Sequence, residues 1–421
     1  MRKVAATIGI VVLAMKVGCA SAEQLTLSVS YSSGAYSNVM LESARRFEMT
    51  HPNIKIEYRM PVLNTYDELL QLTLRSALVG DLADVSLEGS QNVGVLARRR
   101  IPIALDDFIR AEPDWKRLGY SPSIADVGDF QGKTYALAYA VSVPTIYYNL
   151  DLIKEAGIDA ETLPADWSGI ISLSAKVNKL RKDIIGGLFD YHSTGNWTFQ
   201  ALITSQGASI LSADGSEIAL DKPEVLRSLE ILRDFGRAGT VDMTQSQMLQ
   251  AFAAGTVGVF ASFSAAIGQI EKQIAGKFNL KAAPFPAISR DGRVPAGGRV
   301  AMIYAKDPRK QKAAWEFVKF LTGPVGQTIL VKGVGAVPVN ELAVTDKTLL
   351  GSFYDQNPNQ KATLESVPRL TKWLTYPGDN AVKISEGVRN QLRRVLISHD
   401  DPSAVRVDMK KAIEPLLPTK Q

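Results

Sequence analysis

Cysteine and histidine are scarce in this chain. Its 421 residues include one cysteine, Cys19, and three histidines, His51, His192 and His399, which lie far apart without the spacing of metal ligands. No serine is flanked by the glycines of a nucleophile elbow. We therefore expect no disulfide, no metal site, no cofactor and no cysteine or serine nucleophile.

Long apolar runs are also rare, and the one that stands out is near the start of the chain. Arg2 and Lys3 precede the apolar run Val4–Met15, and Ala20–Ala22 has the small residues of a cleavage site. This run is shorter than the ~20 residues that span a bilayer, and no later segment is long and apolar enough to do so. The pattern is typical of a secretory signal. We expect residues 1–22 to be a cleaved signal peptide and the mature protein to be soluble in the periplasm.

Lipid attachment and nucleic-acid binding are both disfavoured. Gly18 precedes Cys19, as in a lipoprotein signal, but Lys16 stands where such signals have an aliphatic residue. The formal charge of +5 falls by three when the predicted leader, with its three basic residues, is removed. The run Arg98–Arg100 follows an apolar helical stretch, where cations interact favourably with the helix dipole. The remaining charge gives little reason to expect a nucleic-acid partner.

Strands and helices alternate after the leader. Leu25–Tyr31 and Ile54–Tyr58 have the patterns of strands, and Ala83–Leu87 forms a third. The helical patterns Asn38–Met49 and Asp67–Leu78 lie between them. This order is typical of an α/β fold with a largely parallel sheet, whose ligands bind beyond the strand ends. The loops at those ends are therefore candidate binding segments.

The segment Leu137–Asp159 predicts a crossing between two sheets. Pro144 lies in the middle of a β-rich run, where it has no N–H for the ladder and so indicates a bend. A strand that bends there can leave one sheet and enter another. Asn149 can cap the helix that follows, and Gly157 can end it.

The rest of the chain divides into a helical middle, a second β-rich stretch and a helical tail. Helical spacing dominates after the crossing, β character resumes at Gly297–Ala305, and a helix follows from Lys310. No internal repeat or long linker is present. We expect two α/β lobes with a hinge near Ala140–Pro144 and near Pro338. The predicted lobes are residues 23–138 plus 290–337 and residues 139–289 plus 338–421.

Two patterns suggest catalysis, and each has a simpler interpretation. Gly128–Thr134 resembles a phosphate-binding loop, but the spacing is one residue short and a strand follows it, which favours a hairpin turn. Asp84 with Glu88, or Asp106 with Asp107, provides the paired carboxylates of a glycosidase. The second pair fits a helix cap better. Glu88 can accept hydrogen bonds from a bound hydroxyl without any reaction, so a secreted carbohydrate-active enzyme stays an alternative.

Loops at the predicted strand ends and helix starts hold the residue types of a carbohydrate-binding site. Such ligands present apolar C–H faces to aromatic rings and hydroxyls to small polar groups. The pair Gly297-Gly298 permits close approach of the backbone. Ser33, His192 and Trp373 are considered as well. The candidate ligand-binding residues are Tyr66, Glu88, Ser90, Ser142, Trp197, Ser262, Ser264, Gly298 and Tyr376.

Short motifs occur along the chain in an order that resembles a known family. They are Arg46-Phe47 with His51-Pro52, Asn64-Thr65-Tyr66, Gly80-Asp81 through Asp84-Val85, Leu105-Asp106-Asp107, Leu137–Asp159, Ala251–Gly255, Gly297-Gly298, Gly335–Pro338, and Phe353-Tyr354 with Asn357-Pro358. In this order they resemble the family 1 extracellular solute-binding proteins of ABC importers, most of all the subgroup that includes the glycerol-3-phosphate binder. The resemblance implies a two-lobe periplasmic-binding-protein fold of class II that closes on a small solute.

The resemblance also assigns roles to individual residues. Tyr66 falls on a ligand-contacting tyrosine of the subgroup, Ser142 on a contacting serine, and Gly298 on the glycine that closes over the ligand. Ser262 or Ser264 falls near another contacting serine, and the offset leaves both open. These positions come from the resemblance and agree with the residue types that a sugar site needs.

Three departures from the subgroup bear on the ligand. Ala140 stands where a polar residue is frequent, Ala336 replaces a tyrosine, and Tyr376 replaces the arginine that pairs with phosphate. The bidentate fork of an arginine is hard to replace for phosphate. We therefore expect a sugar or polyol, with glycerol-3-phosphate or another phosphodiester as the alternative. The predicted protein is a monomeric solute-binding protein, not an enzyme, that serves an ABC permease with a separate ATPase.

Overall fold

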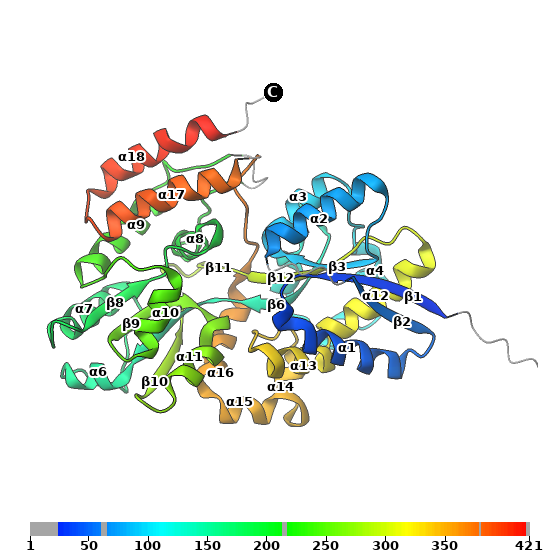
Figure 1. The fold of residues 1–421 in the computed structure, drawn as a ribbon, viewed down its shortest axis with the longest axis horizontal. Helices are drawn as coiled ribbons and strands as arrows, with labels where there is room; N and C mark the ends of the chain where they lie inside the picture. Colours follow the sequence, from blue (N-terminus) through cyan, green and yellow to red (C-terminus); the bar gives the residue numbers. More distant parts are fainter. Residues whose placement is uncertain (1–23, 60–64, 213–216, 379, 418–421) are drawn as a thin grey trace, which may run out of the picture.

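The computed structural model describes residues 24–59, 65–212, 217–378 and 380–417. The predicted signal peptide and Cys19 lie outside these ranges. The chain folds into two α/β halves that lie side by side, with β6 and β12 in the middle of the molecule (Figure 1). None of the helices within the described ranges has the length and apolar character needed to cross a bilayer.

The first half contains a five-stranded sheet of order β2-β1-β3-β12-β6. β2 and β3 both pair with β1 in parallel, whereas β12 pairs with β3 and β6 in the antiparallel sense. β6 therefore runs in the same direction as β1. The strands of this sheet are β1 (Leu25–Tyr31), β2 (Ile54–Arg59), β3 (Val85–Gly89), β6 (Leu137–Ser142) and β12 (Gly297–Ile303).

Helices cover this sheet because their apolar stripes need burial. α1 buries Val39, Met40 and Phe47, and α12 buries Trp315 and Phe317. The helices before β6 and after β12 are α1 (Ser37–Thr50), α2 (Tyr66–Val79), α3 (Val93–Arg98), α4 (Asp106–Ala111), α5 (Pro122–Val127), α12 (Pro308–Thr322) and α13 (Pro324–Val334).

The second half contains a four-stranded sheet of order β10-β7-β9-β8. β7 pairs antiparallel with β9 and β10, and β8 pairs parallel with β9. The strands are β7 (Pro144–Asn149), β8 (Ile185–Phe189), β9 (Val257–Phe263) and β10 (Leu280–Pro284). The helices between them are α6 (Leu150–Glu155), α7 (Trp167–Val177), α8 (Trp197–Thr204), α9 (Pro223–Arg237), α10 (Gln245–Ala253) and α11 (Ile267–Ile274).

The tail returns along both halves. α14 packs on α13 of the first half, α16 packs on β10, and α17 and α18 pack on α9 (Figure 1). A short parallel pair of β11 (Val294–Pro295) and β13 (Leu370–Thr371) joins the tail to the segment before β12. The tail helices are α14 (Glu341–Thr345), α15 (Ser352–Gln356), α16 (Pro358–Ala362), α17 (Ala381–Leu396) and α18 (Pro402–Ile413).

The crossing predicted at Pro144 is confirmed. β6 ends at Ser142 in the first sheet, and β7 begins at Pro144 in the second. Val143 alone separates the two strands. Pro144 stands at the first residue of its strand, where its missing N–H costs no ladder bond. The lobe limits 23–138 plus 290–337 and 139–289 plus 338–421 stay predictions, although β6 belongs to the first sheet as far as Ser142.

Local sequence signals account for the ends of several elements. Asn149 caps α6 by accepting from Asp151 N and Leu152 N, and Gly157 is left-handed with φ 72°, both as expected. The region around Gly132 forms the predicted hairpin of β4 (Asp129–Phe130) and β5 (Lys133–Thr134). These short-range patterns were readable because they depend on neighbouring residues alone.

One expected cap is wrong. The carboxylates Asp106 and Asp107 lie in the first turn of α4, while Leu105 occupies the N-cap position and forms no side-chain cap. Asp106 instead accepts from Thr134 N at 3.3 Å. The acidic residues still suit the helix, because negative charge in the first turn interacts favourably with its dipole.

Candidate functional site

Across the crossing, the strand ends of the first sheet face the strand ends of the second sheet. In the first sheet, β1, β3 and β6 end at this edge, and β12 starts there. In the second sheet, β8, β9 and β10 end at the edge where β7 starts. Ligands of α/β sheets bind beyond the carboxyl ends of the strands. The region between the two edges is therefore the candidate site.

Serines at these edges link the two sheets. The hydroxyls of Ser142, at the end of β6, and Ser264, just after β9, lie 3.3 Å apart. Ser264 Oγ also accepts from Val143 N at 3.0 Å. Ser90, which follows β3, donates to the carbonyl of Ala296 before β12 at 2.8 Å. The crossing segment and two of the predicted site serines thus form one hydrogen-bonded unit.

Ser262 lies deeper than its neighbours and belongs to a buried carboxylate cluster. Its hydroxyl donates to Asp190 Oδ2 at 3.3 Å, and Gln245 Nε2 donates to the same oxygen at 2.6 Å. Burial raises the pKa of Asp190, and these hydrogen bonds oppose that rise. His192, next along the loop, contributes its backbone N–H to Asp190. We interpret this cluster as support for the edge of the second sheet.

Two tryptophans pack against glycines beside the facing edges of the sheets. The indole N–H of Trp197 donates to the carbonyl of Pro295 at 3.1 Å, and a Cβ on Gly297 would lie 3.1 Å from its ring. The rings of Trp197 and Trp373 are 6.4 Å apart in an edge-to-face arrangement. Gly195 has φ 60° and fits beneath Trp373 because it lacks a Cβ. Both tryptophans are buried in this arrangement.

Gly298 has a conformation and a setting that only glycine satisfies. Its φ is 106°, and a Cβ at this position would lie 1.9 Å from the carbonyl oxygen of Ala140. Its partner in the ladder is Val141, beside the crossing. The close packing of β12 on β6 at this point requires the missing side chain.

Arg299, which follows Gly298 in β12, lies at the facing edge of the first sheet and is not among the predicted site residues. Its guanidinium carbon lies 3.8 Å from the ring centroid of Tyr36 and 5.0 Å from that of Tyr66. Its Nη2 donates to the carbonyl of Ser32 at 3.1 Å. Burial raises the pKa of Tyr36, whereas the charge of Arg299 opposes the rise. The sequence feature that could have identified Arg299 is a single arginine in the apolar strand after Gly297-Gly298.

Glu88 points away from the cleft and is fully buried. Its Oε1 accepts from Thr73 Oγ1 at 2.7 Å, Ser86 Oγ at 2.9 Å and Tyr304 OH at 3.1 Å. Its Oε2 has no hydrogen-bond partner. Desolvation raises the pKa of Glu88, and the three hydrogen bonds oppose the rise. Its predicted contact with a ligand hydroxyl stays a prediction, and in this structure its partners are protein groups.

Several buried polar atoms around the cleft have no hydrogen-bond partner in the protein. An unpartnered buried polar group costs about 1–3 kcal/mol. The atoms come from β6 and β12, from the segments that follow β1 and β3, and from the loops before α8 and α17. They are Ser32 Oγ, Gln91 Oε1, Asn92 Nδ2, Tyr139 OH, Asn196 Oδ1, Arg299 Nε, Trp373 Nε1 and Tyr376 OH.

The structure thus brings most of the predicted site residues to the facing edges. Tyr66 contacts Arg299 of β12, and Trp197 packs against Gly297 of the same strand. Ser90, Ser142 and Ser264 lie at or just after strand ends, Ser262 lies within β9, and Gly298 is the second residue of β12. Tyr376 is buried in the tail two residues after Leu374, whose carbonyl accepts from Gln200. Tyr36, Asn196 and Arg299 were missed, because no local pattern shows that these loops meet.

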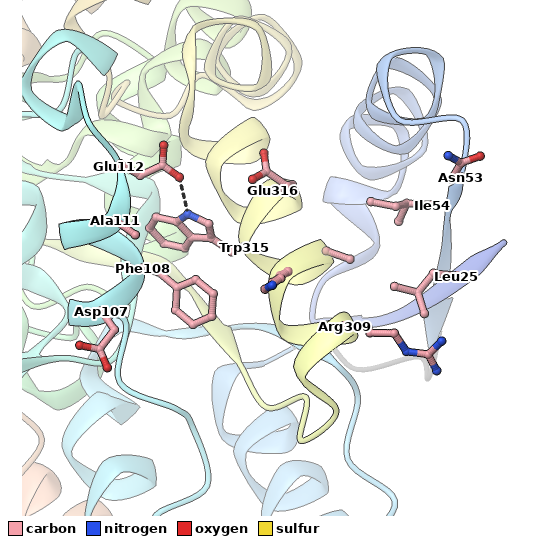
Figure 2. A pocket seen from close by; sticks show the side chains of 12 residues that line it. Leu25, Asn53, Ile54, Asp107, Phe108, Ala111, Glu112, Arg309, Trp315 and Glu316 are labelled. Carbon is pink, nitrogen blue, oxygen red and sulfur yellow. Dashed lines mark hydrogen bonds between the residues drawn. The ribbon is translucent and has the colours of Figure 1, made fainter. Parts of the chain in front are cut away.

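A cavity of about 680 Å³ lies elsewhere, beside α4, α12 and the start of β1 (Figure 2). Leu25, Phe108 and Trp315 contribute its apolar wall, and the indole of Trp315 donates to Glu112 at 2.7 Å. The cavity lies at the amino-terminal end of β1, which is the end of the first sheet opposite the candidate site. None of the predicted ligand-binding residues lines this cavity. Within the described ranges, no cluster of three or more His, Cys, Asp or Glu is placed to hold a metal ion.

Comparison with known proteins agrees with this geometry. A family profile described as bacterial extracellular solute-binding protein matches residues 42–362. The chain belongs to this family of solute-binding proteins. A putative binding protein of Brucella abortus (strain 2308) is 24% identical over an alignment of 418 residues that covers 97% of each chain.

Solved structures share the fold of this solute-binding protein. The sugar-binding protein MalE from Xanthomonas citri superposes with a TM-score of 0.78 at 17% identity, covering 93% of this chain and 97% of that one. UgpB from Mycobacterium tuberculosis in complex with glycerophosphocholine gives a TM-score of 0.76 at 20% identity, covering 92% and 98%. The predicted two-lobe periplasmic-binding-protein fold is confirmed.

Proposed function

We propose that this solute-binding protein is the periplasmic receptor of an ABC importer and that it closes its two lobes on a sugar or polyol. The closed form then docks on a membrane permease that works with a separate ATPase. The monomer binds one solute between the facing sheet edges and carries out no reaction. Residues 1–22 act as the cleaved signal peptide that exports it.

The crossing at Val143 is the observation that carries this proposal. Ser142 ends the last strand of the first sheet, and its hydroxyl meets Ser264 of the second half at 3.3 Å. A solute bound here contacts both halves, so it favours the state in which they are close. The solved relatives that share the fold include a sugar-binding protein.

Scattering and calorimetry test the proposal. Addition of the correct sugar or polyol is expected to lower the radius of gyration in X-ray scattering and to raise the thermal midpoint, because ligand binds the folded closed state. Ser142→Ala is expected to weaken binding about 2- to 10-fold, the value of one neutral hydrogen bond. Ser352→Ala, in an exposed helix turn, serves as the control. Unchanged scattering at saturating ligand would contradict lobe closure.

A glycerophosphodiester is the second candidate ligand. The fold is similar to that of UgpB from Mycobacterium tuberculosis, whose structure holds glycerophosphocholine. Against it stands Tyr376, which occupies the position of the subgroup's phosphate-binding arginine. Calorimetry with glycerol-3-phosphate and glycerophosphocholine beside a panel of neutral sugars separates the two ligand classes.

The carboxylates that suggested a glycosidase are engaged within the protein. Asp84 Oδ2 accepts from Ser28 N at 2.8 Å and from Lys310 Nζ at 2.9 Å. Glu88 is enclosed by Thr73, Ser86 and Tyr304. Neither arrangement resembles an acid and base that flank a glycosidic bond. Sugar turnover that Glu88→Gln or Asp84→Asn abolishes would overturn the assignment as a binding protein.

A further inference from the structure

Arg299 is the most buried lysine or arginine in the described part of the chain, at 5% exposed. A buried cation loses its hydration and normally has a carboxylate partner. The half-buried Lys319, for example, has Glu112 at 2.6 Å and Glu316 at 2.9 Å. Within the described ranges, no Asp or Glu side chain forms an ion pair or hydrogen bond with Arg299.

The carboxyl group nearest along the sheet is directed elsewhere. Glu88 pairs with Val300, the residue after Arg299, and its hydrogen bonds run to Thr73, Ser86 and Tyr304. The groups that do face Arg299 are neutral: two tyrosine rings and the carbonyl of Ser32. The positive charge at this edge of the sheet is therefore not neutralised by the protein.

The guanidinium has hydrogen-bonding capacity that the protein does not use. Nη2 uses a donor on Ser32 O, whereas Nε has no acceptor although it is buried. Guanidinium donors form a planar fork that matches a carboxylate or phosphate bidentately. Two further polar atoms without partners belong to neighbours, Ser32 Oγ and Tyr139 OH. Tyr139 is the neighbour of Ala140, the ladder partner of Arg299.

We propose that Arg299 binds an acidic group of the solute, so that the ligand is a sugar or polyol carrying a carboxylate or phosphoryl group. This inference rests on the proposed function and narrows its ligand class. The family resemblance places a tyrosine, Tyr376, where the subgroup has an arginine in the tail. In this proposal, Arg299 of the first sheet provides the positive charge instead. Tyr36 and Tyr66 hold the guanidinium between their rings and fix the direction of its fork.

Matched pairs of acidic and neutral probes test this by calorimetry. Glucuronate and glucose 6-phosphate are compared with glucose, and glycerol 3-phosphate is compared with glycerol, so that carboxylate and phosphoryl groups are separated. An acidic probe is expected to bind at least about 10-fold more tightly than its neutral partner. Arg299→Gln is expected to lower that affinity by about 10- to 100-fold, and Arg299→Lys, which keeps the charge but loses the fork, by less.

Two controls keep the result interpretable. Arg117→Gln removes the same charge at a side chain that is 86% exposed and is expected to leave binding unchanged. Thermal unfolding of each variant without ligand shows whether Arg299→Gln still folds. If Arg299→Gln does not fold, Arg299→Lys, which keeps the positive charge, replaces it in the test.

The outcomes separate this inference from the proposed function. Neutral probes that bind as tightly as their acidic partners and still compact the protein in X-ray scattering would overturn the acidic ligand and leave the binding function standing. Acidic probes that bind equally well to Arg299→Gln would also overturn it. If no probe of either kind compacts the protein, the proposed sugar or polyol function fails, and the inference about Arg299 fails with it.

Discussion

Two charged residues on adjacent strands of the first sheet have opposite surroundings. Glu88 and Arg299 lie close in the β3–β12 ladder, yet Glu88 is enclosed by hydroxyl donors and Arg299 by tyrosine rings. Burial favours the neutral form of the carboxyl group, whereas an arginine keeps its charge in any protein environment. The carboxyl therefore becomes a support of the sheet, and the arginine stays available as a charge at the cleft.

The buried carboxyl of Glu88 makes stability depend on pH. Its pKa in the folded state is raised above the ordinary value of 4.5, so above pH 4.5 the folded protein binds more protons than the unfolded chain. The free energy of unfolding is then expected to fall as pH rises from 4.5 toward neutrality. Glu88→Gln should flatten this dependence in urea titrations at several pH values, whereas exposed Glu57→Gln should not. Identical pH profiles of Glu88→Gln and the parent would contradict the raised pKa.

Gly298 offers a test of close packing at the crossing. Gly298→Ala meets both a positive φ of 106° and the Ala140 carbonyl at 1.9 Å. The control Gly132→Ala has φ 77° and nothing within 4 Å, so it carries the backbone strain alone. Gly132→Ala is expected to cost about 1–2 kcal/mol of unfolding free energy, and Gly298→Ala about 1–3 kcal/mol more. Equal losses of unfolding free energy in denaturant titrations would mean that β6 shifts away from the added methyl group without destabilising the fold.

At the scale of elements, two capping boxes of the same type stand in different places. Thr65 and Glu68 form a reciprocal box at the start of α2, and Thr244 with Gln247 forms one at the start of α10. α2 begins with Tyr66, which contacts Arg299. The first box therefore positions a cleft residue as well as a helix.

These boxes provide a matched pair of variants. Thr65→Ala and Thr244→Ala are each expected to lower the unfolding free energy by about 1 kcal/mol, because each leaves N-terminal N–H groups without their cap. Only Thr65→Ala is expected to weaken solute binding, since it loosens the turn that holds Tyr66. Denaturant titration and calorimetry measure the two effects. A similar loss of affinity in Thr244→Ala would show that stability alone controls binding.

At the scale of the molecule, the proposed closure depends on contacts that join the two halves. Thr375 of the tail donates its hydroxyl to the carbonyl of Gln91, which follows β3, at 3.0 Å. A contact of this kind is lost if the halves move apart, so it contributes to the free energy of the proposed closure.

Thr375→Val removes one of these links without changing the size of the side chain. It is expected to weaken solute affinity about 2- to 10-fold and to raise the radius of gyration of the unliganded protein, because the closed state loses one hydrogen bond. Thr328→Val removes a hydroxyl that bonds Pro324 within α13 and serves as the control. Calorimetry and X-ray scattering give both values. An unchanged affinity would place Thr375 outside the closing contacts.

Much of the fold was predictable because its signals are local. The alternation of strands and helices, the caps of α6 and the hairpin at Gly132 depend on residues close in sequence. The proline at the start of β7 marked the crossing for the same reason. The Asp106 cap failed because the adjacent Leu105 took the N-cap position, a shift of one residue that helix propensity does not resolve.

The candidate site was predictable in part. The rule that ligands gather beyond the carboxyl edge favours the segments that follow β1 and β3, whereas the roles of Ser142 and Gly298 rest on the family resemblance and stay predictions. The inward turn of Glu88 and the unpaired charge of Arg299 do not follow, because they depend on Thr73, Tyr304 and Tyr36, which are distant in sequence from the groups they contact.

The sequence by itself determined that this chain has two α/β halves, a crossing at Pro144 and serines, glycines and aromatic residues at the strand ends. It did so because backbone geometry and apolar periodicity act over short distances. The tertiary structure alone decided which of those residues face one another and which charge has no partner. Burial and pairing depend on contacts between β12, β3 and the loop before α1, and no local pattern specifies them.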